Sequence, residues 1–102
     1  MKNDMFNGCS SLQNLSLHQG IVSIGYGAFR NCISLKKITI PKGVSSIEND
    51  ACDGCTNLKH VIIPASVAEV GVCVFSDCSK LEAIIIDSMD KITIAHHRFI
   101  IG

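Results

Sequence analysis

The chain has 102 residues, of which 47% are apolar, and its nine Lys plus Arg balance nine Asp plus Glu. That length allows one small domain, and the balanced charge argues against nucleic acid, which attracts proteins with an excess of positive charge. No apolar run reaches the roughly 18 residues that a membrane-spanning helix needs, and the first residues, MKNDMFNGCSSL, lack the apolar core of a secretion signal.

A repeat of 23 residues organises the chain. Four cysteines recur at this interval, at Cys9, Cys32, Cys55 and Cys78. Cut at the same period, the chain divides into four repeats, which cover residues 5–27, 28–50, 51–73 and 74–96. Self-similarity at a fixed period of this length is typical of solenoids, in which each repeat forms one winding of the chain.

The first apolar pattern in each repeat is L-x-x-L-x-L, and it predicts a short strand. Its last two apolar positions alternate with other residues, as in a half-buried strand. These positions are Leu15 and Leu17, Ile38 and Ile40, Val61 and Ile63, and Ile84 and Ile86. Pro41 and Pro64 predict the end of the strand, because proline has no N–H to continue a ladder. Gly20 and Gly43 permit the tight bend that follows.

The second half of each repeat carries further apolar side chains. A second apolar edge is formed by Ile21, Val44 and Val67 together with Ile24, Ile47 and Val70. Next comes the motif A-F-x-x-C, in which Phe29 and Cys32 are three residues apart, so that one helical turn would place both on one face. A single repeat cannot bury all these residues alone, which predicts that the repeats stack as the coils of a solenoid.

The full pattern, C-x-x-L-x-x-I-x-I-P-x-x-V-x-x-I-x-x-x-A-F-x-x-C, resembles the BspA-type leucine-rich repeat and runs through nearly the whole chain. The resemblance implies a leucine-rich-repeat solenoid, an α/β-type superhelix of about four coils with short parallel strands and one-turn helices or 3₁₀ turns. We therefore expect one domain over residues 1–102, in which residues 97–102 form a degenerate repeat or a cap.

The last repeat departs from this pattern. After Ile86 the register slips, and Ile94 and Phe99 recover the apolar spacing only if one residue is inserted. At the other end, the chain enters the pattern midway, just before Phe6. Solenoids normally need capping repeats, so we expect either a fragment of a longer array or a homo-oligomer formed through the uncapped ends.

The four cysteines that recur with the repeat, Cys9, Cys32, Cys55 and Cys78, are interpreted as free thiols of the core. Neighbouring coils stack about 5 Å apart, whereas a disulfide needs Cβ atoms about 3.8 Å apart. Cys52 and Cys55 form C-D-G-C, the spacing of redox dithiols and of half a zinc site. Both fall on core columns of the repeat, Cys52 in place of a phenylalanine, which favours a structural role. Cys73 fits no column, and we expect it near the surface.

Nothing in the sequence predicts an enzyme, a cofactor or a metal site. There is no Ser, His and Asp combination in a supporting context, no glycine-rich phosphate loop and no close carboxylate pair in apolar surroundings. Only disulfide reductase activity that depends on both Cys52 and Cys55 would support the hypothesis of an enzyme.

If the strands stack in parallel, residues between the buried ones form two outward columns on the concave sheet. One column is Asn14, Lys37, His60 and Ala83, and the other is Ser16, Thr39, Ile62 and Ile85. Contiguous exposed apolar side chains usually mark a contact surface. The alternative is that these β-branched residues are present only because they favour strands, with no partner bound to them. We predict that a protein partner contacts Lys37, Thr39, His60, Ile62, Ala83 and Ile85.

Two functions follow as hypotheses. The first is a non-catalytic protein–protein interaction module, and the resemblance implies that it belongs to a cell-surface or secreted protein of adhesion or recognition. The second is a structural or self-assembling repeat segment that has no other ligand. The sequence does not identify the partner.

Overall fold

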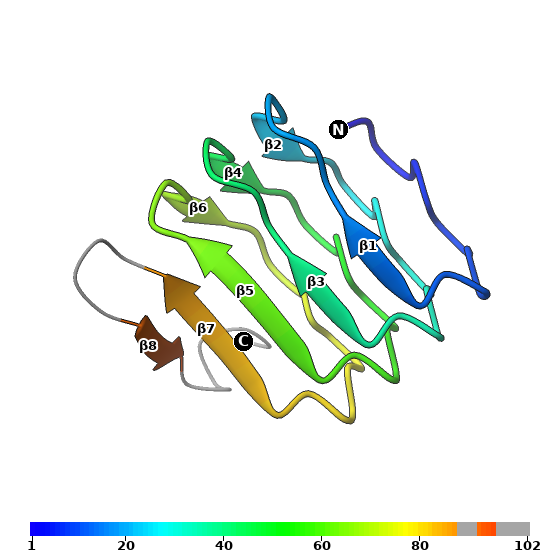
Figure 1. Ribbon diagram of the computed structural model, residues 1–102. Coiled ribbons are helices and arrows are strands. Elements are labelled where there is room, and N and C mark those ends of the chain that lie inside the picture. The colour runs from blue at the N-terminus through cyan, green and yellow to red at the C-terminus, as the bar shows by residue number, and fades with distance from the viewer. Residues whose placement is uncertain (88–91, 96–102) are drawn as a thin grey trace.

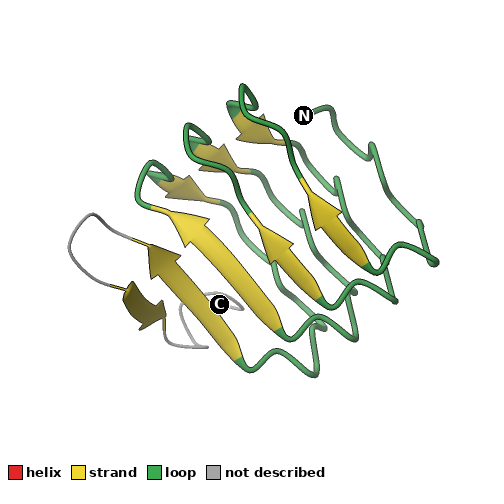
Figure 2. Cartoon of the chain, in the orientation of Figure 1, coloured by secondary structure: helices red, strands yellow, loops and turns green. Residues whose placement is uncertain are grey.

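The computed structural model describes residues 1–87 and 92–95, which form two sheets on opposite sides of one apolar core (Figure 1). Sheet A consists of β1 (Asn14–Ser16), β3 (Lys37–Thr39), β5 (His60–Pro64), β7 (Ala83–Asp87) and β8 (Ile92–Ala95). Sheet B consists of β2 (Ser23–Ile24), β4 (Ser46–Ile47) and β6 (Glu69–Val70). The chain passes from sheet A to sheet B and back in each of three complete turns (Figure 2).

The strands of sheet A stack with the predicted period. Lys37 lies opposite Asn14 on one side and His60 on the other, and His60 lies opposite Ala83, all in parallel pairing. Each partner is one repeat away in the sequence, so the prediction of a parallel leucine-rich-repeat solenoid is confirmed.

The turns that follow sheet A form as predicted. Gly20 and Gly43 have φ values of +98° and +99°, a conformation that costs glycine little because it has no Cβ. β3 ends before Pro41, and β5 ends at Pro64. Both features turn the chain toward sheet B.

Sheet B was foreseen only as an apolar edge. Each of its strands has two residues, with Ile24 and Ile47 buried in the core. Its strands pair in parallel, Ile24 with Ile47 and Ile47 with Val70. The second half of each coil is therefore stacked by backbone hydrogen bonds as well as by apolar contacts.

The A-F-x-x-C segments form tight turns, and the described residues contain no helix, hence none able to cross a membrane. The Cys32 N–H donates to the Phe29 carbonyl at 3.2 Å, and the Leu35 N–H donates to the Cys32 carbonyl at 3.1 Å. These are bonds of the 3₁₀ type, so of the two expected forms the chain adopts the 3₁₀ turn and not the one-turn helix. Asn31, directly before Cys32, has a φ of 60°, and a left-handed residue stops a right-handed helix.

One continuous core joins the coils. Leu35 and Leu58 are fully buried, and Leu12 packs against the same cluster. The rings of Phe6 and Phe29 stack with centroids 5.5 Å apart. Cys52 interrupts this aromatic column in the third repeat, as the sequence predicts, and it is buried there.

Cys73 occupies a column after all. It has a φ of 57°, and the equivalent residues of the other coils, Asp4, Gly27 and Asp50, have φ values of 56°, 60° and 60°. This column is defined by a shared backbone conformation and not by apolar side chains, so the hydrophobic pattern of the sequence does not reveal it. Cys73 is half-buried.

The end of the described chain differs from expectation. β8 pairs antiparallel with β7, which places Ile94 opposite Ile85 in sheet A. With one residue inserted, the I-x-x-x-A-F spacing aligns Ile94 with Ile24 and Ile47 of the second apolar edge, and this alignment is therefore wrong. β7 would otherwise present an unpaired edge, and a strand that folds back satisfies its backbone groups. Phe99 and residues 97–102 lie outside the described residues, so the cap and the limits of the domain stay predictions.

Candidate functional site

The outward face of sheet A gathers the residues that the sequence singled out. Side chains alternate along a strand, so Lys37 and Thr39 are exposed while Ile38 between them is buried. The strand register sets these residues into two columns. The first contains Lys37, His60 and Ala83, and the second contains Thr39, Ile62 and Ile85.

The exposure of these residues is graded across the face. Lys37, Thr39 and His60 are exposed, whereas Ile62 and Ile85 are half-buried. Ala83 is half-buried as well. The apolar part of the face therefore presents less surface to water than the sequence suggested, and polar groups occupy more of it.

Among the residues whose exposure the structure describes, the most exposed large apolar side chains lie elsewhere. They are Met5, Val22, Tyr26, Ile33 and Val72. Met5 precedes the strands of both sheets, and the others lie outside sheet A. Tyr26 and Val72 share one column but lie two coils apart, with the polar Asn49 between them. Scattered single apolar residues are usual on protein surfaces, so they do not compete with sheet A as a contact surface.

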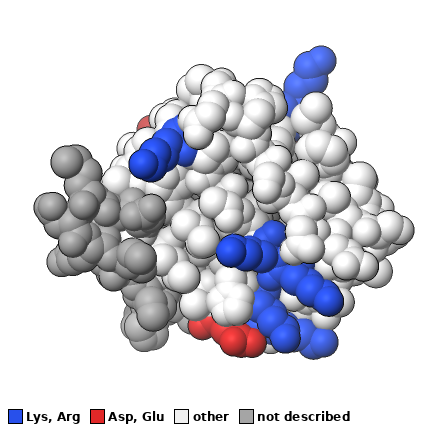
Figure 3. Space-filling model, viewed as in Figure 1, with Lys and Arg blue, Asp and Glu red and all other residues white. Residues whose placement is uncertain are grey.

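Two lysines that sequence reasoning passed over enlarge the polar part of the face. Lys36 and Lys59 each stand one residue before a strand of sheet A, and the Lys59 N–H donates to the Lys36 carbonyl at 2.9 Å. Together with Lys37 they form a group that we call the basic corner. All three lysines are exposed. Seen from this side of the molecule, basic side chains cluster together (Figure 3).

Glu82 bounds the basic corner on the side of β7. Its N–H donates to the Lys59 carbonyl at 2.9 Å, which makes it the next member of the column of Lys36 and Lys59. Its carboxylate Oε1 lies 3.8 Å from Nε2 of His60. Both side chains are largely exposed, so this contact is weak.

A second polar cluster surrounds Arg30, away from sheet A. Its guanidinium donates to the Tyr26 hydroxyl at 3.0 Å and to the Asp50 carboxylate at 2.9 Å. The hydrogen bond to Tyr26, together with the nearby Asp50 and Asp53, raises the pKa of Arg30. Partial burial, with the Asp50 charge, raises the pKa of Asp53. These contacts join successive coils and are interpreted as structural.

The cysteine column makes a ladder of thiol hydrogen bonds. Sγ–H of Cys32 donates to the Phe6 carbonyl at 3.1 Å, and Sγ–H of Cys55 donates to the Phe29 carbonyl at 3.0 Å. In the same way, Cys78 bonds the carbonyl of Cys52 at 3.2 Å. All are free thiols, as predicted.

The C-D-G-C motif belongs to this core. Cys52 and Cys55 are both buried. The hydrogen bond to the Cys55 thiol, followed by burial, raises the pKa of Cys52. A thiol that stays protonated is a poor nucleophile and a poor metal ligand. Within the described residues, no three His, Cys, Asp or Glu side chains are grouped so as to hold a metal.

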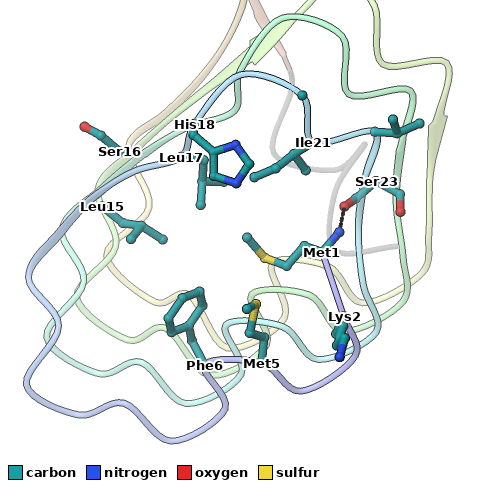
Figure 4. A pocket seen from close by; sticks show the side chains of 12 residues that line it. Met1, Lys2, Met5, Phe6, Leu15, Ser16, Leu17, His18, Ile21 and Ser23 are labelled. Carbon is teal, nitrogen blue, oxygen red and sulfur yellow. Dashed lines mark hydrogen bonds between the residues drawn. The ribbon is translucent and has the colours of Figure 1, made fainter.

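An apolar hollow of about 750 Å³ lies beside the first coil (Figure 4). Met1, Met5 and Phe6 line one side of it, and Leu17 and Ile21 line the other. The Met1 ammonium donates to the Ser23 carbonyl at 2.7 Å, which holds the first residue across the coil. With this lining, the hollow suits an apolar side chain better than a charged ligand.

Comparison with known proteins agrees with this fold. The family model described as BspA type Leucine rich repeat region (6 copies) matches residues 1–99. A crystal structure of a leucine-rich repeat protein from Bacteroides ovatus is similar, with a TM-score of 0.79 and 34% sequence identity over 81% of this chain and 22% of that one. No curated protein matches the chain.

A second crystal structure is that of a leucine rich cell surface protein from Faecalibacterium prausnitzii. It is 33% identical, with a TM-score of 0.75, over 87% of this chain and 23% of that protein. The chain thus spans less than a quarter of the length of either solved structure.

Proposed function

Because the chain belongs to the BspA-type leucine-rich repeat family, we propose that it is a non-catalytic module that binds a protein through the outward face of sheet A. The strand register supports this proposal, because it aligns Lys37, His60 and Ala83 beside Thr39, Ile62 and Ile85 on one face. Protein interfaces combine an apolar centre with polar groups around it, and this face of the sheet presents both kinds of group.

A surface or secreted location is part of the proposal. One of the two similar solved structures is that of a cell surface protein, and we carry that location to this chain as an inference from similarity. Epitope tagging followed by protease treatment of intact cells tests it. Loss of the tag on treatment is expected, and a tag that stays protected while a surface marker is cleaved would contradict the location.

The burial of the chemistry-bearing side chains supports a non-catalytic role. Cys32, Cys52 and Cys55 lie in the core, and the pKa of Cys52 is raised. Such thiols are structural, because a reactive cysteine has a low pKa and access to solvent. Disulfide reductase activity lost on replacing Cys52 or Cys55 would contradict this.

The binding face is tested with apolar-to-polar changes that add no charge. Proteins retained on the immobilised chain are purified, and each is measured by surface plasmon resonance against the variant Ile62→Asn/Ile85→Asn. We expect affinity to fall at least about tenfold, since polar groups replace apolar contacts at the centre of the face. Ile33→Asn is the matched control, because Ile33 is 45% exposed and lies outside sheet A.

The results separate the possible outcomes. A partner lost by the double variant and retained by Ile33→Asn supports the proposal, provided that circular dichroism shows both variants folded. A partner that binds all three proteins equally, or the absence of any saturable protein ligand, contradicts it.

Self-assembly is the second candidate function, and the apolar hollow beside the first coil favours it. Met5 lines the hollow and is 55% exposed. Light scattering over a range of concentrations tests this candidate. Dimers that Met5→Glu disrupts would support self-assembly, and a monomer at all concentrations would exclude it.

A further inference from the structure

We propose that the protein partner presents an acidic segment, rich in Asp or Glu, to the basic corner formed by Lys36, Lys37 and Lys59. This inference rests on the proposed function, because it gives the chemistry of the partner at the same face. It adds two residues, Lys36 and Lys59, to those predicted from strand alternation.

The basic corner is a local excess of charge in a neutral chain. Formal net charge is zero, yet the acidic residues of the coils lie largely on other surfaces. Glu69 is part of β6 in sheet B, and Asp50 pairs with Arg30 beyond sheet B. On the face viewed in Figure 3, basic atoms gather in one group low in the view, with acidic atoms at its edge, and other basic side chains stand apart from this group.

The arrangement of the lysines does not stabilise the fold. Lys36 and Lys59 are stacked in adjacent coils, joined by a backbone hydrogen bond of 2.9 Å. Like charges on directly neighbouring strands destabilise a sheet. Among the residues that the structure describes, the ion pairs involve Arg30 and His60 and none of these three lysines. Their charges therefore stay available to an external carboxylate.

The surroundings of the basic corner favour a protein over other anions. Lys37 is two residues from Thr39 on β3, and Thr39 lies opposite the half-buried Ile62. An acidic segment that also carries apolar residues would contact both parts of the face. A nucleic acid or an anionic membrane would need a broader basic surface. The negative charge of Glu82 at the margin of the basic corner would repel such an extended anion.

Fluorescence anisotropy tests the inference directly. The probe is a fluorescein-labelled peptide with a half made of Glu and a half made of Leu and Val, and its counterpart carries Lys in place of each Glu. We expect the Glu peptide to bind and the Lys peptide not to bind. Added sodium chloride should weaken the binding, because salt screens exposed charges.

Matched lysine variants locate the contact. The Lys36→Gln/Lys59→Gln variant should bind the Glu peptide with about tenfold lower affinity, because two charge-assisted contacts are lost. Lys42→Gln should leave the affinity unchanged, since Lys42 is exposed in the turn after β3. Equal thermal unfolding of the variants checks that the fold is kept.

Several outcomes would overturn the inference. Among them are equal binding of the two peptides, equal losses for both sets of lysine variants, and binding of heparin or phosphatidylserine vesicles without binding of the Glu peptide. A purified partner that loses binding to the Ile62→Asn/Ile85→Asn variant but still binds the Lys36→Gln/Lys59→Gln variant would refute the inference of an acidic segment. That result would leave the proposed function intact. A partner insensitive to both pairs would refute both.

Discussion

The first coil, residues 5–27, and the second coil, residues 28–50, carry similar residues in the same columns but bury them differently. Phe29, Cys32, Leu35 and Ile38 are all fully buried. Their counterparts in the first coil are each partly exposed, and these are Phe6, Cys9, Leu12 and Leu15. Three of these four positions hold the same residue type in both coils, so residue type alone does not account for the difference.

The difference shows where burial comes from in a solenoid. The second coil packs against the first on one side and against the third on the other. The first coil packs against only one coil among those described. In such structures, stability is approximately the sum of terms for each repeat and for each interface between neighbours. A side chain between two interfaces therefore contributes more than the same side chain beside one.

Truncating the equivalent leucine in each coil tests whether a side chain between two coils contributes more stability than one beside a single coil. We expect Leu35→Ala to lower the free energy of unfolding by about 2 to 5 kcal/mol, because it leaves a cavity in a fully packed site. Leu12→Ala should cost about 1 kcal/mol, since Leu12 is already partly exposed. Urea unfolding followed by circular dichroism measures both values. Equal losses would show that burial between two coils adds nothing.

Alkaline pH probes the inner coils by another route. The hydrogen bond to Cys55, followed by burial, raises the pKa of Cys32 and likewise that of Cys52. Unfolded thiols ionise above about pH 8.5, while these folded thiols keep their protons. The unfolded state then binds fewer protons, so the free energy of unfolding falls as pH rises. Each thiol contributes about 1.4 kcal/mol per pH unit once ionisation of the unfolded chain is complete.

The alkaline effect has a matched control. Urea unfolding at several values between about pH 8 and pH 10 gives the slope for the natural chain and for two variants. Cys32→Ala should have a shallower slope, because one buried thiol is gone. Val44→Ala is destabilised by a similar packing defect and keeps every thiol, so its slope should be unchanged. Equal slopes for the two variants would contradict the assignment.

Much of the fold could be predicted because residues that are one repeat apart in the sequence also lie opposite each other in neighbouring strands. The spacing of the cysteines gives the register of β1, β3, β5 and β7, and the glycines mark the bends. Sheet B escaped prediction because a strand of two residues is too short to show alternation. The antiparallel return of β8 was missed as well, since the pairing of an exposed edge depends on tertiary structure rather than on local pattern.

The candidate site was predictable in its alignment and less so in its exposure. Lys37, His60 and Ala83 form one column because the register requires it. That Ile62 and Ile85 are only half exposed depends on neighbouring side chains, which a strand pattern does not describe. Lys36 and Lys59 were overlooked because they precede the strands and so fall outside the alternation.

The smallest expected effect concerns the left-handed column, in which Gly27 and Cys73 hold equivalent places two coils apart. Cys73 has a φ of 57°, and a residue with a Cβ pays about 1 to 2 kcal/mol in that conformation. Glycine removes this strain but makes the unfolded chain more flexible. We therefore expect Cys73→Gly to raise the free energy of unfolding by about 0.5 to 1 kcal/mol.

The reverse change at Gly27 is the control. A Cβ there would lie 2.5 Å from Asp4 Oδ1, in addition to the strain at a φ of +60°, so Gly27→Ala should destabilise the chain. Urea unfolding of both variants decides the matter. If Cys73→Gly also destabilised the chain, packing of the Cys73 side chain would outweigh backbone strain, and the column would be held by contacts as the apolar columns are. An increase would instead show that the coils are matched by backbone conformation at this corner, independently of how deeply each one is buried.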